Sequence, residues 1–140
     1  MTADLADLYM LIRRFEGCRL MPYLCPAGVW TCGWGSTGAD VFPGKPWTQE
    51  YADRRMQLDA LKFAKGTLLA CPGIQGRQLS AIADFAYNLG LGALRGSTLR
   101  KRVLAEDWDA VRHELGRWVR GGGRVLPGLV LRRAAEAALL

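Results

Sequence analysis

Half of the 140 residues are hydrophobic and 23% are charged, which excludes an intrinsically disordered chain. At this length the composition predicts one globular domain that needs no disulfide framework. The 19 basic and 13 acidic residues give a formal charge of +6, so the chain should be attracted to polyanions such as nucleic acid, an anionic membrane surface or a bacterial envelope.

The first predicted element is an amphipathic helix over residues 3–15. Apolar residues recur there at helical spacing, at Leu5, Leu8, Ile12 and Phe15. Thr2 is the candidate N-cap, and Gly17 supplies the residue type on which helices commonly end. Glu16 is therefore expected at the junction between this helix and the next segment.

Residues 18–46 differ in composition from the helix before them. Proline and glycine recur among tryptophan, tyrosine, valine and threonine, which is typical of short strands joined by tight turns. We expect two or three antiparallel strands here, centred on residues 29–34.

The rest of the chain is expected to be helical. Thr48 caps a long helix that runs to about residue 70, where Pro72 and Gly73 end it. Four further helices are predicted, around Leu79–Ala86 up to Gly90, from Ser97 or Thr98 through Leu104, over Trp108–Trp118 up to Gly121–Gly123, and from Pro127 onward.

These elements predict an α+β fold in a single domain over residues 1–140. Residues 16–46 would form a small β-rich lobe, residues 48–70 a connecting helix, and residues 1–15 and 70–140 a larger helical lobe. A cleft between two such lobes is a place where a polymer can lie.

The N-terminal segment does not read as a signal peptide, because Asp4, Asp7, Arg13 and Arg14 interrupt any apolar core. No stretch reaches the length and apolarity of a membrane span. We therefore expect synthesis in the cytoplasm, no membrane insertion, and release only with the help of another component.

Neither a metal nor a cofactor is expected. Cys18, Cys25 and Cys32 recur at seven-residue spacing, which does not match the short ligand spacings of structural zinc sites. His113 is the only histidine. A more specific hypothesis for the cysteines is that oxidation joins Cys25 to Cys18 or Cys32 and inactivates the protein.

Glu16 is the first candidate for chemistry. The C-terminus of a helix carries partial negative charge, which disfavours ionisation of a nearby carboxyl group and so favours the protonated form that a general acid needs. A pairing of Glu16 with Arg13 or Arg14 would oppose this effect. The alternative is an ordinary surface glutamate at a helix end.

Three groups of motifs occur in chain order. In the first, Glu16, Cys25 and Thr31 are nine and six residues apart, within a stretch that includes Gly28–Thr31 and Gly33-Trp34-Gly35. The second comprises residues 85–90, Gly92 and residues 97–99, and the third comprises residues 117–119, 122–123, 125–129 and 132–133. Together they resemble the phage-type lysozyme family, and the third group resembles the C-terminal part of lambdoid-phage endolysins.

The resemblance implies a lysozyme-like fold and a muramidase that hydrolyses the β-1,4 bond between N-acetylmuramic acid and N-acetylglucosamine in peptidoglycan, which would lyse the host bacterium. Glu16 would be the general acid, and Cys25 and Thr31 would position the attacking water on the opposite face of the sugar, an inverting arrangement. The family often has a histidine where Ser36 stands, and its absence should affect local stability more than activity.

Cys25 has three alternative chemical roles. The family has aspartate or cysteine at this place, and a thiol is mostly neutral at pH 7 unless its surroundings change that. Cys25 could orient the water, act as a thiolate base, or act as a nucleophile. The preferred hypothesis is that it positions the water.

The resemblance also implies Tyr87, Asn88 and Thr98 as substrate contacts in the cleft, although Tyr87 could equally belong to the core. Trp30, Trp34 and Trp47 could stack on sugars or be buried, whereas Trp108 and Trp118 fit an apolar helical stripe. Arg132 or Arg133 could pair with Glu16 across the gap between the lobes, and spacing does not decide which.

Three other functions stay open. A lytic transglycosylase would cleave the same bond without water, and a degenerate binding module would hold peptidoglycan without cutting it. A nucleic-acid-binding protein is disfavoured, because the sequence has neither a clustered basic stripe nor a known motif. We expect a monomer whose partner is peptidoglycan and which reaches the periplasm from the host cytoplasm through a holin.

Overall fold

A computed structural model describes residues 4–140. Its first helix, α1 (Ala6–Glu16), starts later than the sequence predicts. Just before it, the side chain of Asp4 accepts a hydrogen bond from the backbone N–H of Ala6 at 2.9 Å. The predicted cap, Thr2, lies outside the described residues. The helix ends at Gly17, as predicted, and makes Glu16 its last residue.

A small antiparallel sheet follows α1. Its strands are β1 (Arg19–Leu24), β2 (Trp30–Gly33) and β3 (Ser36–Thr37), in the order β1-β2-β3. A tight turn joins the first two strands: the N–H of Cys25 donates to the carbonyl of Val29 at 3.0 Å, and the N–H of Gly28 donates to the carbonyl of Cys25 at 2.8 Å. The prediction of two or three strands in this segment is confirmed.

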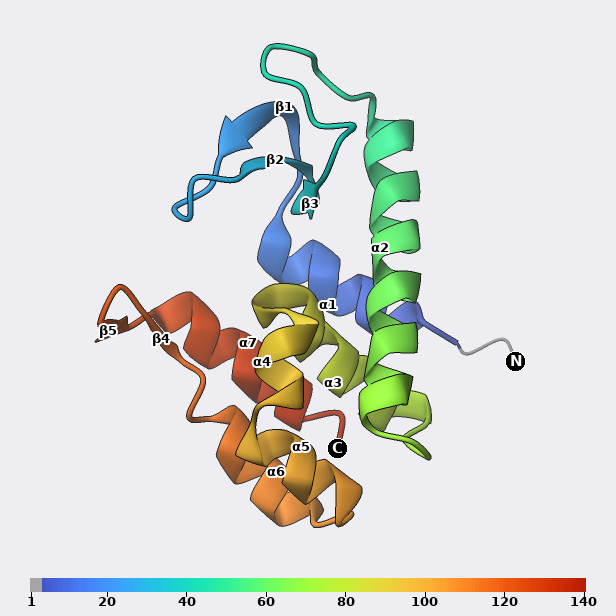
Figure 1. Ribbon diagram of the computed structural model, residues 1–140, viewed down its shortest axis with the longest axis vertical. Helices are drawn as coiled ribbons and strands as arrows, with labels where there is room; N and C mark the ends of the chain where they lie inside the picture. The colour runs from blue at the N-terminus through green and yellow to red at the C-terminus, as the bar shows by residue number, and fades with distance from the viewer. Residues whose placement is uncertain (1–3) are drawn as a thin grey trace.

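The long helix α2 (Gln49–Ala70) connects the sheet to the other helices (Figure 1). The hydroxyl of Thr48 accepts a hydrogen bond from the N–H of Tyr51 at 3.1 Å, so Thr48 is the N-cap that the sequence predicts. The N-terminal half of α2 packs on β2 and β3, and the helix also packs on α1, α3 and α4.

The four further helices that the sequence predicts are present after α2. They are α3 (Gly76–Leu89), α5 (Thr98–Leu104), α6 (Trp108–Leu115) and the C-terminal helix α7 (Pro127–Ala137). A short helix, α4 (Leu91–Arg95), was not expected from the sequence. Every residue of α3 from Leu79 to Ala86 is buried, because α1, α2, α4 and α7 all pack against it. In Figure 1 α3 lies behind α4 at the centre of the molecule.

The prediction of a helix over residues 108–118 is wrong at its end. Helix α6 stops at Leu115 with Gly116 as its cap, and the chain then forms a hairpin of β4 (Arg120–Gly121) and β5 (Arg124–Val125). Gly122 and Gly123, at φ 59° and 82°, form the two-residue turn, a conformation typical of tight hairpins. Trp118 therefore lies outside the helix, although its ring still packs edge-on against Phe85.

Three apolar clusters stabilise these elements. One lies between the sheet and α2 and consists of Cys32, Val41, Trp47 and Ala52. A second joins α1, α2 and α3, and the largest lies among α3, α5 and α6. The result is an α+β fold, as predicted. No helix within residues 4–140 is long and apolar enough to cross a membrane.

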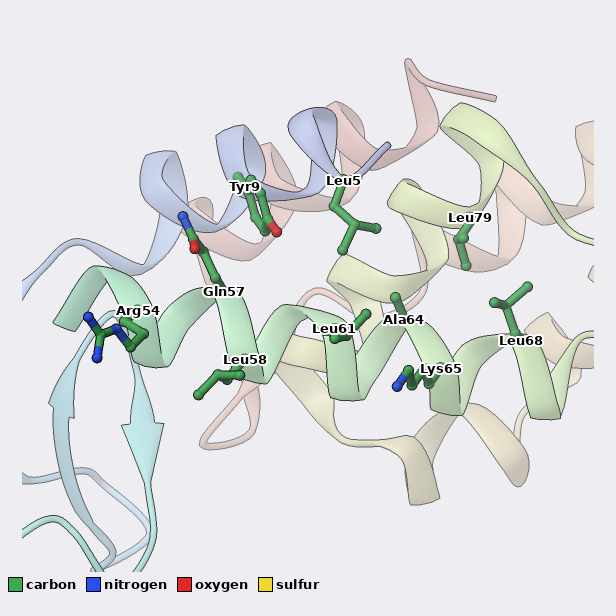
Figure 2. A pocket seen from close by; sticks show the side chains of 10 residues that line it. All are labelled: Leu5, Tyr9, Arg54, Gln57, Leu58, Leu61, Ala64, Lys65, Leu68 and Leu79. Carbon is green, nitrogen blue, oxygen red and sulfur yellow. The ribbon is translucent and has the colours of Figure 1, made fainter. Parts of the chain in front are cut away.

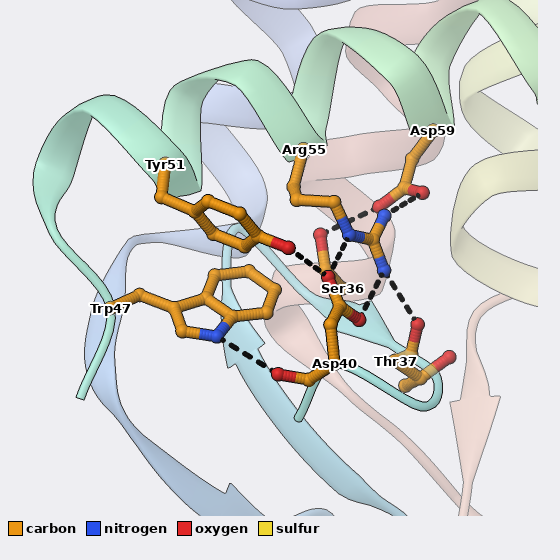
Figure 3. A network of polar contacts seen from close by, with 7 residues as sticks. All are labelled: Ser36, Thr37, Asp40, Trp47, Tyr51, Arg55 and Asp59. Carbon is orange, nitrogen blue, oxygen red and sulfur yellow. Dashed lines mark hydrogen bonds and ion pairs between the residues drawn. The ribbon is translucent and has the colours of Figure 1, made fainter. Parts of the chain in front are cut away.

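A polar network, here called the α2 anchor, fixes the sheet and the following loop to α2 (Figure 3). The guanidinium of Arg55 pairs with Asp59, donates to the carbonyl of Thr37 at 2.8 Å and contacts Asp40 at 2.6 Å. Ser36, which is buried, donates its hydroxyl proton to Asp59 at 2.6 Å. The hydrogen bond from Arg55 lowers the pKa of Asp40, and Tyr51 adds to this effect.

Candidate active site

Glu16 lies where α1 meets the sheet, and its side chain is 21% exposed. One carboxylate oxygen, Oε2, accepts a hydrogen bond from Nη1 of Arg132 at 2.6 Å. The other oxygen, Oε1, lies against the backbone of Gly35, where a Cβ atom would stand only 2.7 Å away. The carboxyl group is thus held between the end of the sheet and α7.

Arg132 is itself held by a buried acid. Its Nε and Nη2 atoms donate to the two carboxylate oxygens of Asp84, each at 2.8 Å. Burial alone would lower the pKa of Arg132, but the hydrogen bonds and charges of Asp84 and Glu16 outweigh burial and raise it. Glu16, Arg132 and Asp84 come from α1, α7 and α3 and are here called the Glu16 network.

The neighbouring arginine has other partners. Arg133 pairs with the buried Glu136 at 2.8 Å and donates to the side-chain carbonyl of Asn88 at 2.7 Å. Of the two arginines that the sequence offers as partners of Glu16, the structure selects Arg132. The side-chain oxygen of Asn88, a predicted substrate contact, is engaged in holding Arg133.

Cys25 lies just after β1, in the turn to β2, and Thr31 lies on β2. The β1–β2 register pairs Tyr23 with Thr31, so Cys25 lies two residues beyond the strand partner of Thr31. A backbone hydrogen bond from Val29 lowers the pKa of the Cys25 thiol, opposed by burial. In the folded chain the Thr31 hydroxyl donates to the carbonyl of Val29 at 2.9 Å.

Tyr87 links α3 to the sheet. Its hydroxyl donates to the carbonyl of Trp34 at 2.6 Å, next to Gly35. Burial raises the pKa of Tyr87 strongly, and the carboxylates of Asp59 and Glu16 add to the shift. Tyr87 therefore lies on the side of α3 that faces Glu16. It is a neutral phenol, and its hydroxyl proton is engaged in the hydrogen bond to Trp34.

Thr98 lies apart from these groups. It is exposed at the start of α5 and lines a hollow of about 360 Å³ together with Gly96, Ser97, Glu114, Arg117 and Trp118. This hollow includes none of the other predicted site residues. Of these two predicted substrate contacts, Tyr87 therefore lies near Glu16, whereas Thr98 lies in a separate hollow.

The tryptophans divide into exposed and packed rings. Trp30 is 39% exposed and offers a free face, whereas Trp47 is buried and donates to the carbonyl of Asp40. Trp34 is half-buried and donates to Asp53 at 2.8 Å. Trp108 and Trp118 pack against the helical core, as predicted.

The four cysteines are free. Cys32 is buried with its sulfur 3.3 Å from the carbonyl oxygen of Leu20, and the oxidation of Cys25 stays a prediction. Within residues 4–140 no group of three or more His, Cys, Asp or Glu side chains is arranged to hold a metal ion.

Sequence reasoning missed two residues of the site. Asp84 is the one charged residue within the mostly apolar stretch of residues 79–86, and a charge at such a place signals a buried partner. Gly35 belongs to the motif Gly33-Trp34-Gly35, but the number of residues between Gly35 and Glu16 does not show that the two are in contact.

Comparison with known proteins agrees with this architecture. The model of the family described as "Phage lysozyme" matches residues 13–136. The endolysin of Acyrthosiphon pisum secondary endosymbiont phage 1 is 37% identical over 136 residues, which cover 93% of this chain and 92% of that protein. The endolysin of Bacillus phage B103 is 36% identical over 132 residues, 92% of this chain and 50% of that protein, so the chain spans half the length of this relative.

A solved structure extends the likeness to three dimensions. The muramidase domain of SpmX from Asticaccaulis excentricus superposes with a TM-score of 0.87 at 27% identity, over 99% of this chain and 96% of that domain. Because the family match covers most of the chain and the relatives exceed 30% identity, the chain belongs to the phage lysozyme family.

Proposed function

We propose that the chain is an endolysin that hydrolyses the β-1,4 bond between N-acetylmuramic acid and N-acetylglucosamine in bacterial peptidoglycan. The observation that carries the proposal is the position of Glu16, at the junction of sheet and helices and oriented by Arg132, in a chain whose residues 13–136 match the phage lysozyme family.

Glu16 acts as the general acid in this proposal. Arg132 holds Oε2 at 2.6 Å, and Asp84 fixes Arg132 through two further hydrogen bonds. Oε1 is then the oxygen that carries the proton to the glycosidic oxygen. Holding the acid in one orientation reduces the entropy that must be lost in the transition state.

Thr31 and Cys25 position the attacking water. Because the hydroxyl of Thr31 gives its proton to the carbonyl of Val29, its lone pairs are available to accept a hydrogen bond from water. The Cys25 sulfur, in the turn before β2, provides a second acceptor. A water held by two acceptors keeps a lone pair free to attack the anomeric carbon from the face opposite Glu16, which gives inversion, and the proton that this water loses passes to solvent.

The test compares the wild type with Glu16→Gln on Gram-negative cells whose outer membrane has been stripped, with mass spectrometry of the released muropeptides. We expect reducing, hydrolysed products from the wild type and a loss of at least about 100-fold in the folded variant. The matched control is Glu50→Gln on the exposed start of α2, which should keep full activity.

Other products would identify another function. Anhydro ends, lighter by one water, would make the protein a lytic transglycosylase. Binding to the wall without release of fragments would make it a binding module. Net retention of the anomeric form would contradict the inverting role of Cys25 and Thr31.

For its cellular route, we propose that the chain acts as a monomer in the periplasm after a holin releases it from the host cytoplasm. Relatives named SAR-endolysin, such as that of bacteriophage PS119 at 33% identity, make the release step worth testing separately. Expression with and without a holin decides it, since lysis in the absence of any holin would contradict this route.

A further inference from the structure

The exposed side of α2 carries an unusual pattern of side chains. Three leucines there face solvent, Leu58, Leu61 and Leu69, with 56%, 42% and 79% of their surface exposed. Their spacing of three and eight residues keeps them on one stripe of the helix. Together with the exposed polar residues of the same stretch they form what is here called the α2 outer face: Arg54, Gln57, Leu58, Leu61, Lys62, Lys65 and Leu69.

An apolar groove of about 550 Å³ runs beside this face (Figure 2). Leu5 and Tyr9, at the start and in the middle of the first helix, and Leu79 of α3 line its far wall. Leu58, Leu61 and Lys65 line both this groove and a second hollow, of about 400 Å³, whose other lining residues also come from α2. Leu58 and Leu61 therefore lie where the two hollows adjoin.

The charges on this face have a single sign. Arg54, Lys62 and Lys65 are exposed, and none of the described residues that line the two hollows is acidic. Of the three acids of α2, Asp53 accepts from Trp34 and Gln49, and Asp59 binds Ser36 and Arg55 of the α2 anchor. The third, Glu50, is exposed in the first turn of α2 and lines neither hollow.

Exposed leucines beside cations, without acids, match the chemistry of an anionic lipid surface. The leucines can enter the boundary between headgroups and acyl chains while the lysine ammonium groups stay at the phosphates. The formal charge of +6 on the whole chain acts in the same direction.

We propose that the α2 outer face docks the protein on the surface of an anionic phospholipid bilayer, with α2 lying parallel to that surface. None of the residues that line the groove belongs to the Glu16 network, and neither Cys25 nor Thr31 lines it. The docked protein therefore keeps its site available, and docking does not depend on the proposed hydrolase activity.

The test measures partitioning of the full chain onto phosphatidylcholine vesicles with and without phosphatidylglycerol, by co-sedimentation. We expect binding only to the vesicles that contain phosphatidylglycerol. The double variant Lys62→Gln/Lys65→Gln should weaken it about 25-fold, since each lysine near such a surface contributes about fivefold. Leu58→Gln/Leu61→Gln should also abolish most binding at unchanged net charge.

The matched controls remove the same kinds of side chain, two cations or an exposed leucine, from α5, where Lys101, Arg102 and Leu104 are exposed. Lys101→Gln/Arg102→Gln and Leu104→Gln should bind as the wild type does, and so should Glu16→Gln. Equal loss in the α5 and α2 charge variants would reduce the effect to net charge and overturn the proposal.

Two further outcomes also overturn it. One is the absence of binding to vesicles that contain phosphatidylglycerol. The other is lipid-independent dimerisation, seen by sedimentation velocity and abolished by Leu58→Gln/Leu61→Gln, which would assign the face to a second copy of the chain. Circular dichroism of each variant confirms that it is folded, as expected for changes at exposed positions.

Discussion

Cys25, in the turn after β1, and Thr31, on β2, present different chemistry. Thr31 is buried, and its proton is given to a backbone carbonyl, so it can only accept from a water. Cys25 is half-buried, and backbone hydrogen bonding lowers the pKa of its thiol. A lowered pKa increases the thiolate fraction of Cys25 near neutral pH. It does not decide whether Cys25 orients the water as a thiol or acts on it as a thiolate base.

Substitution of Cys25 separates orientation of the water from base catalysis. If the thiol orients the water, Cys25→Ser should keep most activity and the wild-type pH profile, whereas Cys25→Ala should lose about 10- to 100-fold in kcat. Wall-clearing rates across pH 5 to 9 measure this, a range that brackets the reference thiol pKa of about 8.5. Loss of an alkaline rise in Cys25→Ser would identify a thiolate base instead.

Gly35 determines where the Glu16 carboxyl group can lie. Gly35→Ala would place a Cβ atom 2.7 Å from Oε1 at a residue with φ 89°, so we expect loss of about 1 kcal/mol of stability together with a large fall in kcat. Gly44→Ala is the control, because Gly44 has φ 79° and no atom near its Cβ position. It should lose similar stability and no activity, and equal activity in the two variants would show that Glu16 is not held by this contact.

At the scale of elements, the α2 anchor decides how the sheet is held on the long helix. Arg55 bridges Asp40, Asp59 and the carbonyl of Thr37, and no long strand pairing supplements it, since β3 has only two residues. Ser36 joins the same network, in the place where the family often has a histidine, by its bond to Asp59. The position of the sheet, and with it that of Cys25 and Thr31, depends on these contacts.

Arg55→Gln should therefore lower the free energy of unfolding by about 2 kcal/mol at neutral pH. The folded-state pKa of Asp40 is lowered by Arg55, so this stability is present above the ordinary carboxyl pKa and is lost as the pH falls through the folded value. The difference between wild type and variant should thus shrink below about pH 4. Urea unfolding at a series of pH values measures it, with the exposed neighbour Arg54→Gln as control, and a difference independent of pH would contradict the role of Asp40.

At the scale of the whole molecule, the Glu16 network joins the first helix to the last. Arg132 on α7 binds Asp84 on α3 and Glu16 on α1, and Glu16 and Arg132 are 116 residues apart in the sequence. The same contacts that orient Glu16 therefore also join three helices. Stability and activity should fall together when the network is broken.

Arg132→Gln should cost about 3–5 kcal/mol, because it leaves the buried Asp84 without its cation, and it should lower kcat in whatever fraction stays folded. Asp84→Asn keeps a hydrogen-bonding side chain and should cost less, with a smaller effect on kcat. Thermal unfolding and clearing assays measure both effects against Arg102→Gln, an exposed arginine. A stable, fully active Arg132→Gln would show that Glu16 needs no positioning partner.

The sequence by itself determined the features that neighbouring residues control. Helical periodicity and the capping residues Thr48 and Ser97 placed most helices, proline and glycine placed the sheet, and the spacing of Glu16, Cys25 and Thr31 pointed to the family. These signals are local, since a cap or a turn depends on residues within one helical turn of it.

Only the tertiary structure decided the contacts between distant segments. Arg132 and Arg133 look equivalent in sequence, but side chains of adjacent helical residues point about 100° apart, and the packing of α7 turns Arg132 toward Glu16 and Arg133 toward Glu136. The end of α6 at Leu115 and the separation of Thr98 from Tyr87 are likewise set by packing. The sequence names the residues that can form the site, whereas the relative placement of α1, α3 and α7 determines which of them meet, because each contact joins segments that no local signal connects.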